Sequence, residues 1–261
     1  EAMEELRIPV DCIVGTSMGA VVGGLYASGL SPERIREIMV SADWDDLFSD
    51  RPPRERIPFR RKQFDNLPLF EFEFGLTRKG LSLPSGLIAG QKLDFLLKAV
   101  LLHTTPVEPF DDLPVPYRAV ATDLATGRMV VLDHGDLATA LRASMSVPGA
   151  FSPIRIDGVD LVDGGISRNL PVDVARDWGA VRVIAVDISN PVRPQEDDLS
   201  ALGVISWSMN MLLEQNMEIS RKSIGTADFF ISPDLGDMGP GDFHRVQEAA
   251  DVGREAMLAA R

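Results

Sequence analysis

The sequence predicts an α/β fold in which helices cover both faces of a mainly parallel central sheet. Short apolar runs bounded by Gly, Pro or Asp alternate along the chain with longer stretches of helical periodicity. This alternation favours a parallel sheet, because each helical crossover returns the chain to the same end of the sheet. The chain has 261 residues, 45% of them hydrophobic and 25% charged, which suffices for a sizeable core. No repeat or linker is visible, so we expect one domain over residues 1–261.

The individual elements follow from local signals. Apolar runs predict strands near residues 11–15, 117–122, 129–132, 159–162, 181–187 and 229–231. Helical spacing predicts helices at residues 17–28, 32–42, 91–103, 137–143, 171–178 and 199–224. The first helix ends before Gly29, and the second follows a Ser31 cap with Pro32 at its first position. The last helix carries aromatic and methionine side chains that suit either core packing or an adaptable lipid or dimer surface, namely Trp207, Met209, Met211 and Met217.

An insertion interrupts this pattern at about residues 51–90. It is rich in Pro, Gly and Phe, and Phe70, Phe72 and Phe74 alternate with glutamates, which predicts a half-buried strand. Its first part, residues 51–62, holds six basic side chains, and it is either a solvated loop or a contact for lipid headgroups. The whole insertion is interpreted as a lid-like flap over a substrate site or as a structural cover.

Charge and cysteine content exclude several function classes. A net charge of −13 and a pI near 4.7 argue against a nucleic-acid partner, since phosphate binding needs a surplus of Lys and Arg. Cys12 is the only cysteine, so neither an internal disulfide nor a thiolate metal cluster can form. No paired-His or acidic calcium motif is present, and we expect no metal and no cofactor. No apolar run approaches the roughly 20 residues of a membrane helix, so we expect any membrane contact to be peripheral.

The strongest chemical signal is the G-x-S-x-G motif formed by residues 15–19. A predicted strand runs into Ser17 and a helix of small residues runs out, which is the strand–turn–helix context of an activated serine. Gly15 and Gly19 are expected to prevent collisions in the strained turn. The backbone N–H of Met18, at the start of the helix, is an oxyanion donor by this interpretation. The alternative is a tight turn with an incidental serine.

A nucleophilic serine needs a base, and two residues compete for the role. Asp163 follows an apolar strand and precedes Gly164 and Gly165, whose small size lets the backbone pass close to another group. A partly buried Asp there can bond to Ser17 and accept its proton. His244 is the one histidine that completes the order Ser, Asp, His, although its position at the start of an amphipathic helix is typical of a surface histidine.

Four motifs in order resemble the patatin-like phospholipases: residues 15–20, 122–127, 143–151 and 163–172. The resemblance implies an α/β-hydrolase-related, three-layer fold and a catalytic dyad of Ser17 and Asp163, which removes the need for a histidine. It implies a lipid acyl hydrolase of phospholipase A type that works through an acyl-serine intermediate, with a phospholipid or other lipid ester as substrate. A homodimer is a further expectation.

Residues 58–63, 84–93 and 232–236 further resemble bacterial members whose catalytic domain is followed by an outer-membrane barrel. This implies a secreted or outer-membrane location in a Gram-negative bacterium, with a cytoplasmic location as the alternative. The family takes its oxyanion hole from a glycine-rich loop after a first strand, and we expect both to be missing from this sequence. Loss of an oxyanion donor costs about 10²- to 10³-fold in turnover. A lipid-binding or assembly module with lost or weak catalysis is therefore the alternative function.

Overall fold

The computed structural model describes residues 1–50, 59, 75–77, 80–82, 88–189, 201–239 and 241–260. The predicted strand at Phe70–Phe74 and, apart from Phe59, the basic stretch at 51–62 lie outside the described residues. A short antiparallel hairpin of β2 (Gly75–Thr77) and β3 (Gly80–Ser82) belongs to the insertion. The predicted single domain over residues 1–261 stays a prediction.

The central sheet contains β1 (Ile13–Thr16), β4 (Tyr117–Asp123), β5 (Met129–Leu132), β6 (Ile154–Ile156) and β7 (Val159–Asp163). Its order is β1-β4-β7-β6, and β5 pairs with β4 as well. β1 is parallel to β4, whereas β5 and β7 are antiparallel to β4, and β6 is antiparallel to β7. The described sheet is therefore mixed, which corrects the expectation of a mainly parallel one.

Tight turns explain the antiparallel pairs. β4 returns directly as β5 through a turn in which Gly127 has a φ of 69°. β6 returns as β7 through Asp157 and Gly158, whose φ values are 50° and 82°. Two successive positive φ angles are typical of the type I′ hairpin turn, and Asp-Gly is its common sequence. This dipeptide signal was available in the sequence, but β6 was not predicted from it.

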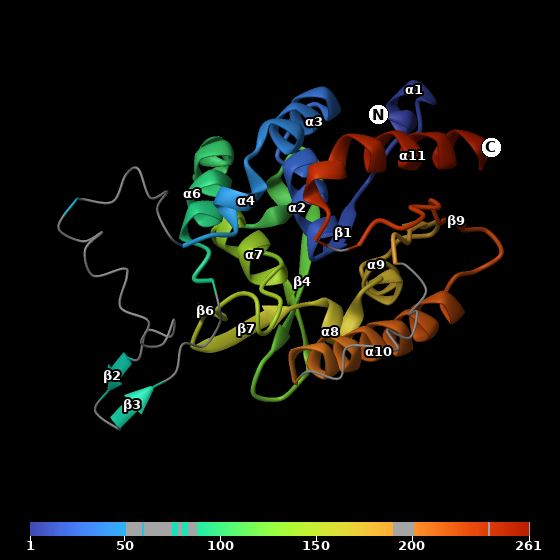
Figure 1. Ribbon diagram of the computed structural model, residues 1–261. Helices are drawn as coiled ribbons and strands as arrows, with labels where there is room; N and C mark the ends of the chain where they lie inside the picture. The colour runs from blue at the N-terminus through green and yellow to red at the C-terminus, as the bar shows by residue number, and fades with distance from the viewer. Residues whose placement is uncertain are drawn as a thin grey trace.

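Helices cover both faces of the sheet, as predicted (Figure 1). On β4, Tyr117 faces one side, where its hydroxyl donates to the Ala20 carbonyl of α2 (Met18–Ala27) at 2.8 Å. Thr122 lies an odd number of residues further on and therefore faces the other side. There its Oγ1 lies 2.8 Å from the Ser167 hydroxyl of α8 (Gly165–Arg168). The α/β class and the two helical layers are thus confirmed.

The other helices extend these two layers. Beside α2 lie α3 (Pro32–Ser41), the short α4 (Trp44–Leu47), α6 (Gln91–Val100) and α7 (Leu137–Ser144). α10 (Ala201–Lys222) packs against α8, and its Asn216 amide donates to the Ile166 carbonyl. α9 (Val172–Asp177) contacts β1, and α1 (Ala2–Glu5) packs against the C-terminal α11 (Val246–Ala259). β8 (Ile184–Val186) and β9 (Phe229–Ile231) form a separate parallel pair.

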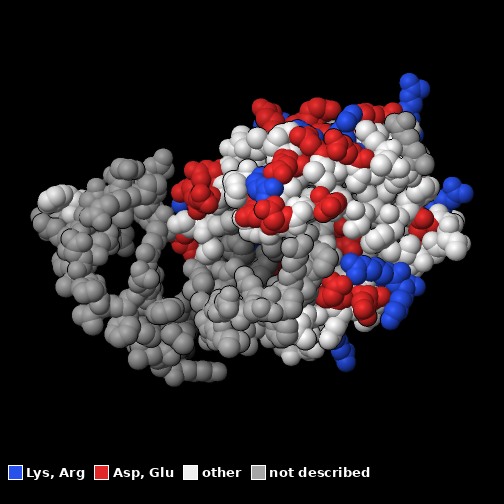
Figure 2. Space-filling view, turned by 45° about the vertical axis from the view of Figure 1, so that its right-hand side comes forward, with Lys and Arg blue, Asp and Glu red and all other residues white. Residues whose placement is uncertain are grey.

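The main core lies between the sheet and the layer of α2, α6 and α7. Phe110, Tyr117, Leu141 and Leu161 are almost fully buried there. Over the part of the chain that the structure describes, no helix is both long and apolar enough to cross a membrane. Acidic side chains gather across the upper part of the described surface, in keeping with the net charge of −13 (Figure 2).

Candidate active site

Two strands meet end to end along one edge of β4. β5 occupies the other edge of β4, where it pairs with Val120 and Ala121. On the facing edge, Val120 is paired with Thr16 of β1 and Ala121 with Asp163 of β7. Because β1 is parallel and β7 antiparallel to β4, the C-terminal ends of β1 and β7 point at each other. The sheet register therefore brings Ser17, directly after β1, next to Asp163, the last residue of β7.

Ser17 occupies a strained turn between β1 and α2. Its φ is 53° and its ψ is −123°, a conformation that is costly for a residue with a side chain. Gly15 makes this turn feasible: a Cβ there would lie 2.5 Å from the Gly19 carbonyl oxygen and 2.7 Å from the Ala20 Cα. The sequence also predicted that a side chain at position 19 would collide with its surroundings. That prediction is wrong, because a Cβ at Gly19 would meet nothing within 4 Å.

Ser17 and Asp163 are joined by a short hydrogen bond. The Ser17 hydroxyl donates to Oδ2 of Asp163 at 2.6 Å, and the Gly165 amide donates to Oδ1 at 2.7 Å. Asp163 is only 6% exposed. Burial raises the pKa of Asp163 to about 6, and the hydrogen bonds from Ser17 and Gly165 act in the opposite direction. A carboxylate with this pKa can take a proton from serine and return it near neutral pH.

Of the two glycines after Asp163, Gly164 is required by a close backbone contact, whereas Gly165 lies against side chains. A Cβ on Gly164 would lie 2.1 Å from the Val120 carbonyl oxygen. A Cβ on Gly165 would lie 2.8 Å from a Leu213 methyl group and 3.0 Å from Oδ1 of Asp163. The chain can therefore turn away from β7 directly behind the carboxylate, as the sequence predicted.

Met18 is the first residue of α2, and the first amides of a helix have no acceptor within the helix. Its N–H is therefore available beside Ser17 for an oxyanion, and that role stays a prediction. Among the described residues, no histidine is hydrogen-bonded to Ser17 or Asp163. His103 bonds the Ser28 carbonyl at 3.0 Å and His134 contacts Asp133, whereas His244 lies in the 3₁₀ turn before α11. The hydroxyl of Ser17 is thus hydrogen-bonded to Asp163, and the choice between a dyad and a triad stays a prediction.

A narrow apolar crevice lies along α2, the helix that follows Ser17. Met18 forms one of its walls, and α2, α3, α6 and the α7 end supply the others. Its lining consists of Met18, Val21, Leu25, Ile38, Met39, Ala42, Trp44, Leu93, Leu96, Leu97, Val100 and Met145. The open space in it is narrow, about 20 Å³. Its lining is apolar apart from the Trp44 indole N–H, which donates to the Met39 carbonyl, and a hydrocarbon chain would enter it only if these side chains moved apart.

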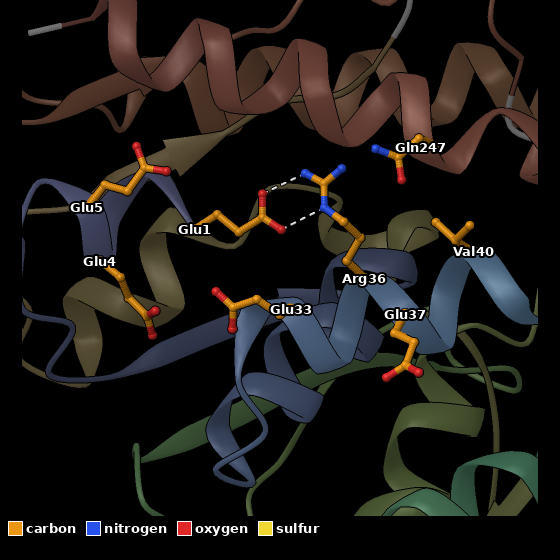
Figure 3. Close-up of a pocket in the computed structure, with 8 residues that line it drawn as sticks. All are labelled: Glu1, Glu4, Glu5, Glu33, Arg36, Glu37, Val40 and Gln247. Atoms are coloured by element: carbon orange, nitrogen blue, oxygen red, sulfur yellow. Dashed lines mark hydrogen bonds and ion pairs between the residues drawn. The ribbon is translucent and has the colours of Figure 1, made fainter.

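A larger hollow of about 500 Å³ lies elsewhere, where α1, α3 and α11 meet (Figure 3). Five glutamates line it, and Arg36 is bonded to the Glu1 carboxylate there at 2.7 Å through Nε. It contains neither Ser17 nor Asp163. Over the described ranges no group of three or more His, Cys, Asp or Glu side chains could hold a metal ion.

Comparison with known proteins places this fold and site in a family. The model of the patatin-like phospholipases matches residues 1–176, which include both Ser17 and Asp163. An NTE family protein of Mycobacterium bovis is 33% identical over 205 residues, covering 77% of this chain and 48% of its own length. The human patatin-like phospholipase domain-containing protein 6 is 30% identical over 205 residues, covering 78% of this chain and 13% of its own. The rat patatin-like phospholipase domain-containing protein 7 is 34% identical over 206 residues, covering 77% of this chain and 13% of its own length.

The chain belongs to the patatin-like phospholipase family. It spans about half the length of the mycobacterial relative and a much smaller share of the mammalian ones. The family resemblance predicted from four short motifs is thus confirmed. Ser144 and Ser146 belong to the motif at residues 143–151, and both contact the dyad backbone, which no sequence pattern indicated.

Proposed function

We propose that this chain hydrolyses acyl esters of lipids, in the manner of a phospholipase A, with Ser17 as nucleophile and Asp163 as base. The observation that carries the proposal is the 2.6 Å hydrogen bond from the Ser17 hydroxyl to the buried Asp163 carboxylate. Membership of a phospholipase family supports the substrate class. The apolar crevice beside Met18 supports an acyl chain as the group that is bound.

The proposed reaction has two halves. In the first, Oδ2 of Asp163 accepts the hydroxyl proton while Oγ of Ser17 attacks the ester carbonyl carbon. Negative charge then develops on the carbonyl oxygen beside the Met18 N–H and the positive end of α2. Collapse of this intermediate expels the alcohol, which takes the proton from Asp163. In the second half, water attacks the acyl-serine, Asp163 accepts the proton of the water, and the fatty acid leaves as Ser17 recovers its hydrogen.

A fluorophosphonate probe tests the proposal, because it reacts covalently with an activated serine. We expect intact-mass analysis to show one adduct on the wild-type chain and none on Ser17→Ala, with both proteins equally folded by circular dichroism. Release of fatty acid from phosphatidylcholine vesicles should follow the same pattern. An adduct on Ser17→Ala, or fatty-acid release by it, would contradict the assignment of Ser17.

A parallel variant separates the dyad from a triad. His244→Ala should keep the labelling rate and ester hydrolysis of the wild type, whereas Asp163→Ala should lose both. Loss of activity in His244→Ala would favour the triad instead. The secreted or outer-membrane location, the peripheral membrane contact and the homodimer stay predictions from the sequence.

A further inference from the structure

The C-terminal end of α7 and the two residues after it contact the backbone of both dyad residues. α7 ends at Ser144, and Ser144 and Ser146 are each fully buried. The Ser17 amide donates to the Ser144 hydroxyl oxygen at 3.0 Å. The Gly164 amide donates to the Ser144 carbonyl at 3.2 Å, and the Asp163 amide donates to the Ser146 carbonyl at 2.9 Å. The segment of residues 144–146 at the end of α7 thus accepts hydrogen bonds from the amides of both Ser17 and Asp163.

The Ser144 hydroxyl also reaches the strand that aligns both residues. It donates to the Val120 carbonyl at 2.6 Å, and Val120 is the β4 residue paired with Thr16. The Ser17 amide follows the last residue of β1, where the sheet ladder ends. Without the Ser144 oxygen, this amide and the Val120 carbonyl would each lose a partner inside the protein. The hydroxyl therefore ties the strained turn to the sheet.

We propose that Ser144 is a positioning residue, whose hydroxyl holds the Ser17 turn so that Oγ stays aimed at Asp163. The inference rests on the proposed function, since it concerns the same dyad. The Ser144 carbonyl, which binds Gly164, is untouched by a side-chain substitution. Removal of the hydroxyl therefore releases the nucleophile but leaves the backbone support of the base in place.

Ser144→Ala is the direct test. Relaxation of the Ser17 turn should displace Oγ, and a misplacement of about 1 Å costs on the order of 100-fold in rate. We expect kcat for a short-chain ester and the rate of fluorophosphonate labelling to fall by roughly 10- to 100-fold. KM should change by less than about threefold, because the hydroxyl lies on the protein backbone and not in the apolar crevice.

Ser28→Ala is the matched control. Ser28 is also at the C-terminal end of a helix, is 4% exposed, and donates its hydroxyl to the Leu25 carbonyl at 2.7 Å. The Ser28→Ala substitution removes one buried hydrogen bond without touching the dyad. We expect its melting temperature to fall less than that of Ser144→Ala, which removes two hydrogen bonds, while its kcat stays at the wild-type value.

The outcomes separate the two proposals. A wild-type chain that takes no label overturns the proposed function and this inference with it. A labelled wild type together with Ser144→Ala labelled at the same rate overturns this inference alone, as does an equal fall of kcat in Ser28→Ala. If Ser144→Ala does not fold, Ser144→Cys replaces it, because the thiol fills the site but is a weak acceptor. The same fall in kcat is then expected, and wild-type kcat overturns the inference.

Discussion

Asp163 combines two properties that oppose each other in a base: it is buried, and it must carry a charge to act. Burial raises its pKa to about 6, while the donors on both oxygens favour the ionised form. Below this pKa the carboxyl is protonated and cannot accept the Ser17 proton. The resting site is therefore sensitive to pH through a single residue.

We expect kcat/KM for a neutral ester to rise with pH and to level off above about pH 6. On the acid side it should fall about tenfold for each pH unit, because only the ionised fraction of Asp163 acts as base. Stopped-assay rates between pH 4 and 9 would show this. A profile centred at pH 4, the range of an exposed aspartate, would contradict it.

The same pKa affects stability with a definite sign. The folded-state pKa of Asp163 is raised from 3.8 to about 6, so the folded protein favours the neutral carboxyl. The neutral carboxyl of Asp163 stabilises the folded protein fully below pH 3.8. This contribution to the free energy of unfolding, about 3 kcal/mol, is lost as the pH rises through 6. Asp163→Asn removes the charge. We expect it to melt above the wild type at pH 8, by a margin that shrinks at pH 4, while activity is lost.

Asp187→Asn is the comparison for that experiment. Asp187 is 2% exposed, like Asp163, but it is paired with Arg221 at 2.7 Å. Loss of this charge removes the buried one of the two carboxylates that pair with Arg221, the other being Glu214, so the melting temperature should fall at pH 8. A rise in both variants would mean that burial alone, and not the unpaired charge of Asp163, decides the effect.

Gly15 and Gly19 have the same place in the motif but not the same constraint. A Cβ at Gly15 would lie within 2.7 Å of backbone atoms, which cannot move aside, whereas Gly19 has open space. We expect Gly15→Ala to lower the melting temperature by several degrees and to lose fluorophosphonate labelling. Gly19→Ala should melt no lower than the wild type, because alanine is favoured over glycine in a helix by about 0.5–1 kcal/mol. If Gly15→Ala and Gly19→Ala melted at the same temperature, the turn at Gly15 would be shown to adapt to a side chain.

At the scale of whole elements, helices were easier to predict than strand directions. The α3 helix follows its Ser31 cap, whose side chain accepts from the Arg34 amide at 3.3 Å, and α10 covers nearly the predicted span. The positions of the predicted strands were also recovered, because buried strands are continuous apolar runs, although β6 was missed. Their directions were not, because direction depends on the short connections, and the Asp157-Gly158 turn was not used.

The site was predictable to a different depth. Ser17 and Asp163 could be singled out because each carries its own chemistry and local glycine signature, and the structure joins them by a hydrogen bond, while their catalytic roles stay predictions. Ser144 was not, because a buried serine at a helix end has no sequence pattern that reveals which distant amide it binds. Residues that support a site through tertiary contacts become visible only when the elements are packed.

The crevice that α6 lines leads to a prediction about the length of the acyl chain in the preferred ester. Leu96 lines the crevice, whereas Ala99, on the same helix, is exposed and is not part of the lining. Leu96→Trp should narrow the crevice and lower kcat/KM for p-nitrophenyl palmitate more than for the butyrate, by roughly tenfold or more. The Ala99→Trp control should leave the ratio of the two esters unchanged. An unchanged ratio in Leu96→Trp would place the acyl chain elsewhere.

At the scale of the molecule, the dyad is joined by contacts between segments that are far apart in the sequence. Ile13 pairs with Tyr117, and Asp163 pairs with Ala121, while local turns account for the β4–β5 and β6–β7 pairs. A shift of β7 by one residue would turn the Asp163 side chain to the other face of the sheet. The 2.6 Å hydrogen bond therefore exists only when both registers are correct.

Because the C-terminal ends of β1 and β7 meet at the dyad, we expect the active site to form late in folding. Helices need only local contacts and form early, whereas the β1–β4 pairing must close a long loop of chain. After dilution from denaturant, we expect the far-ultraviolet helical signal to recover before the capacity to react with a fluorophosphonate. Simultaneous recovery of the two signals would contradict this order. A folding chain that has its helices but not this junction would thus keep Ser17 and Asp163 apart until the sheet is complete.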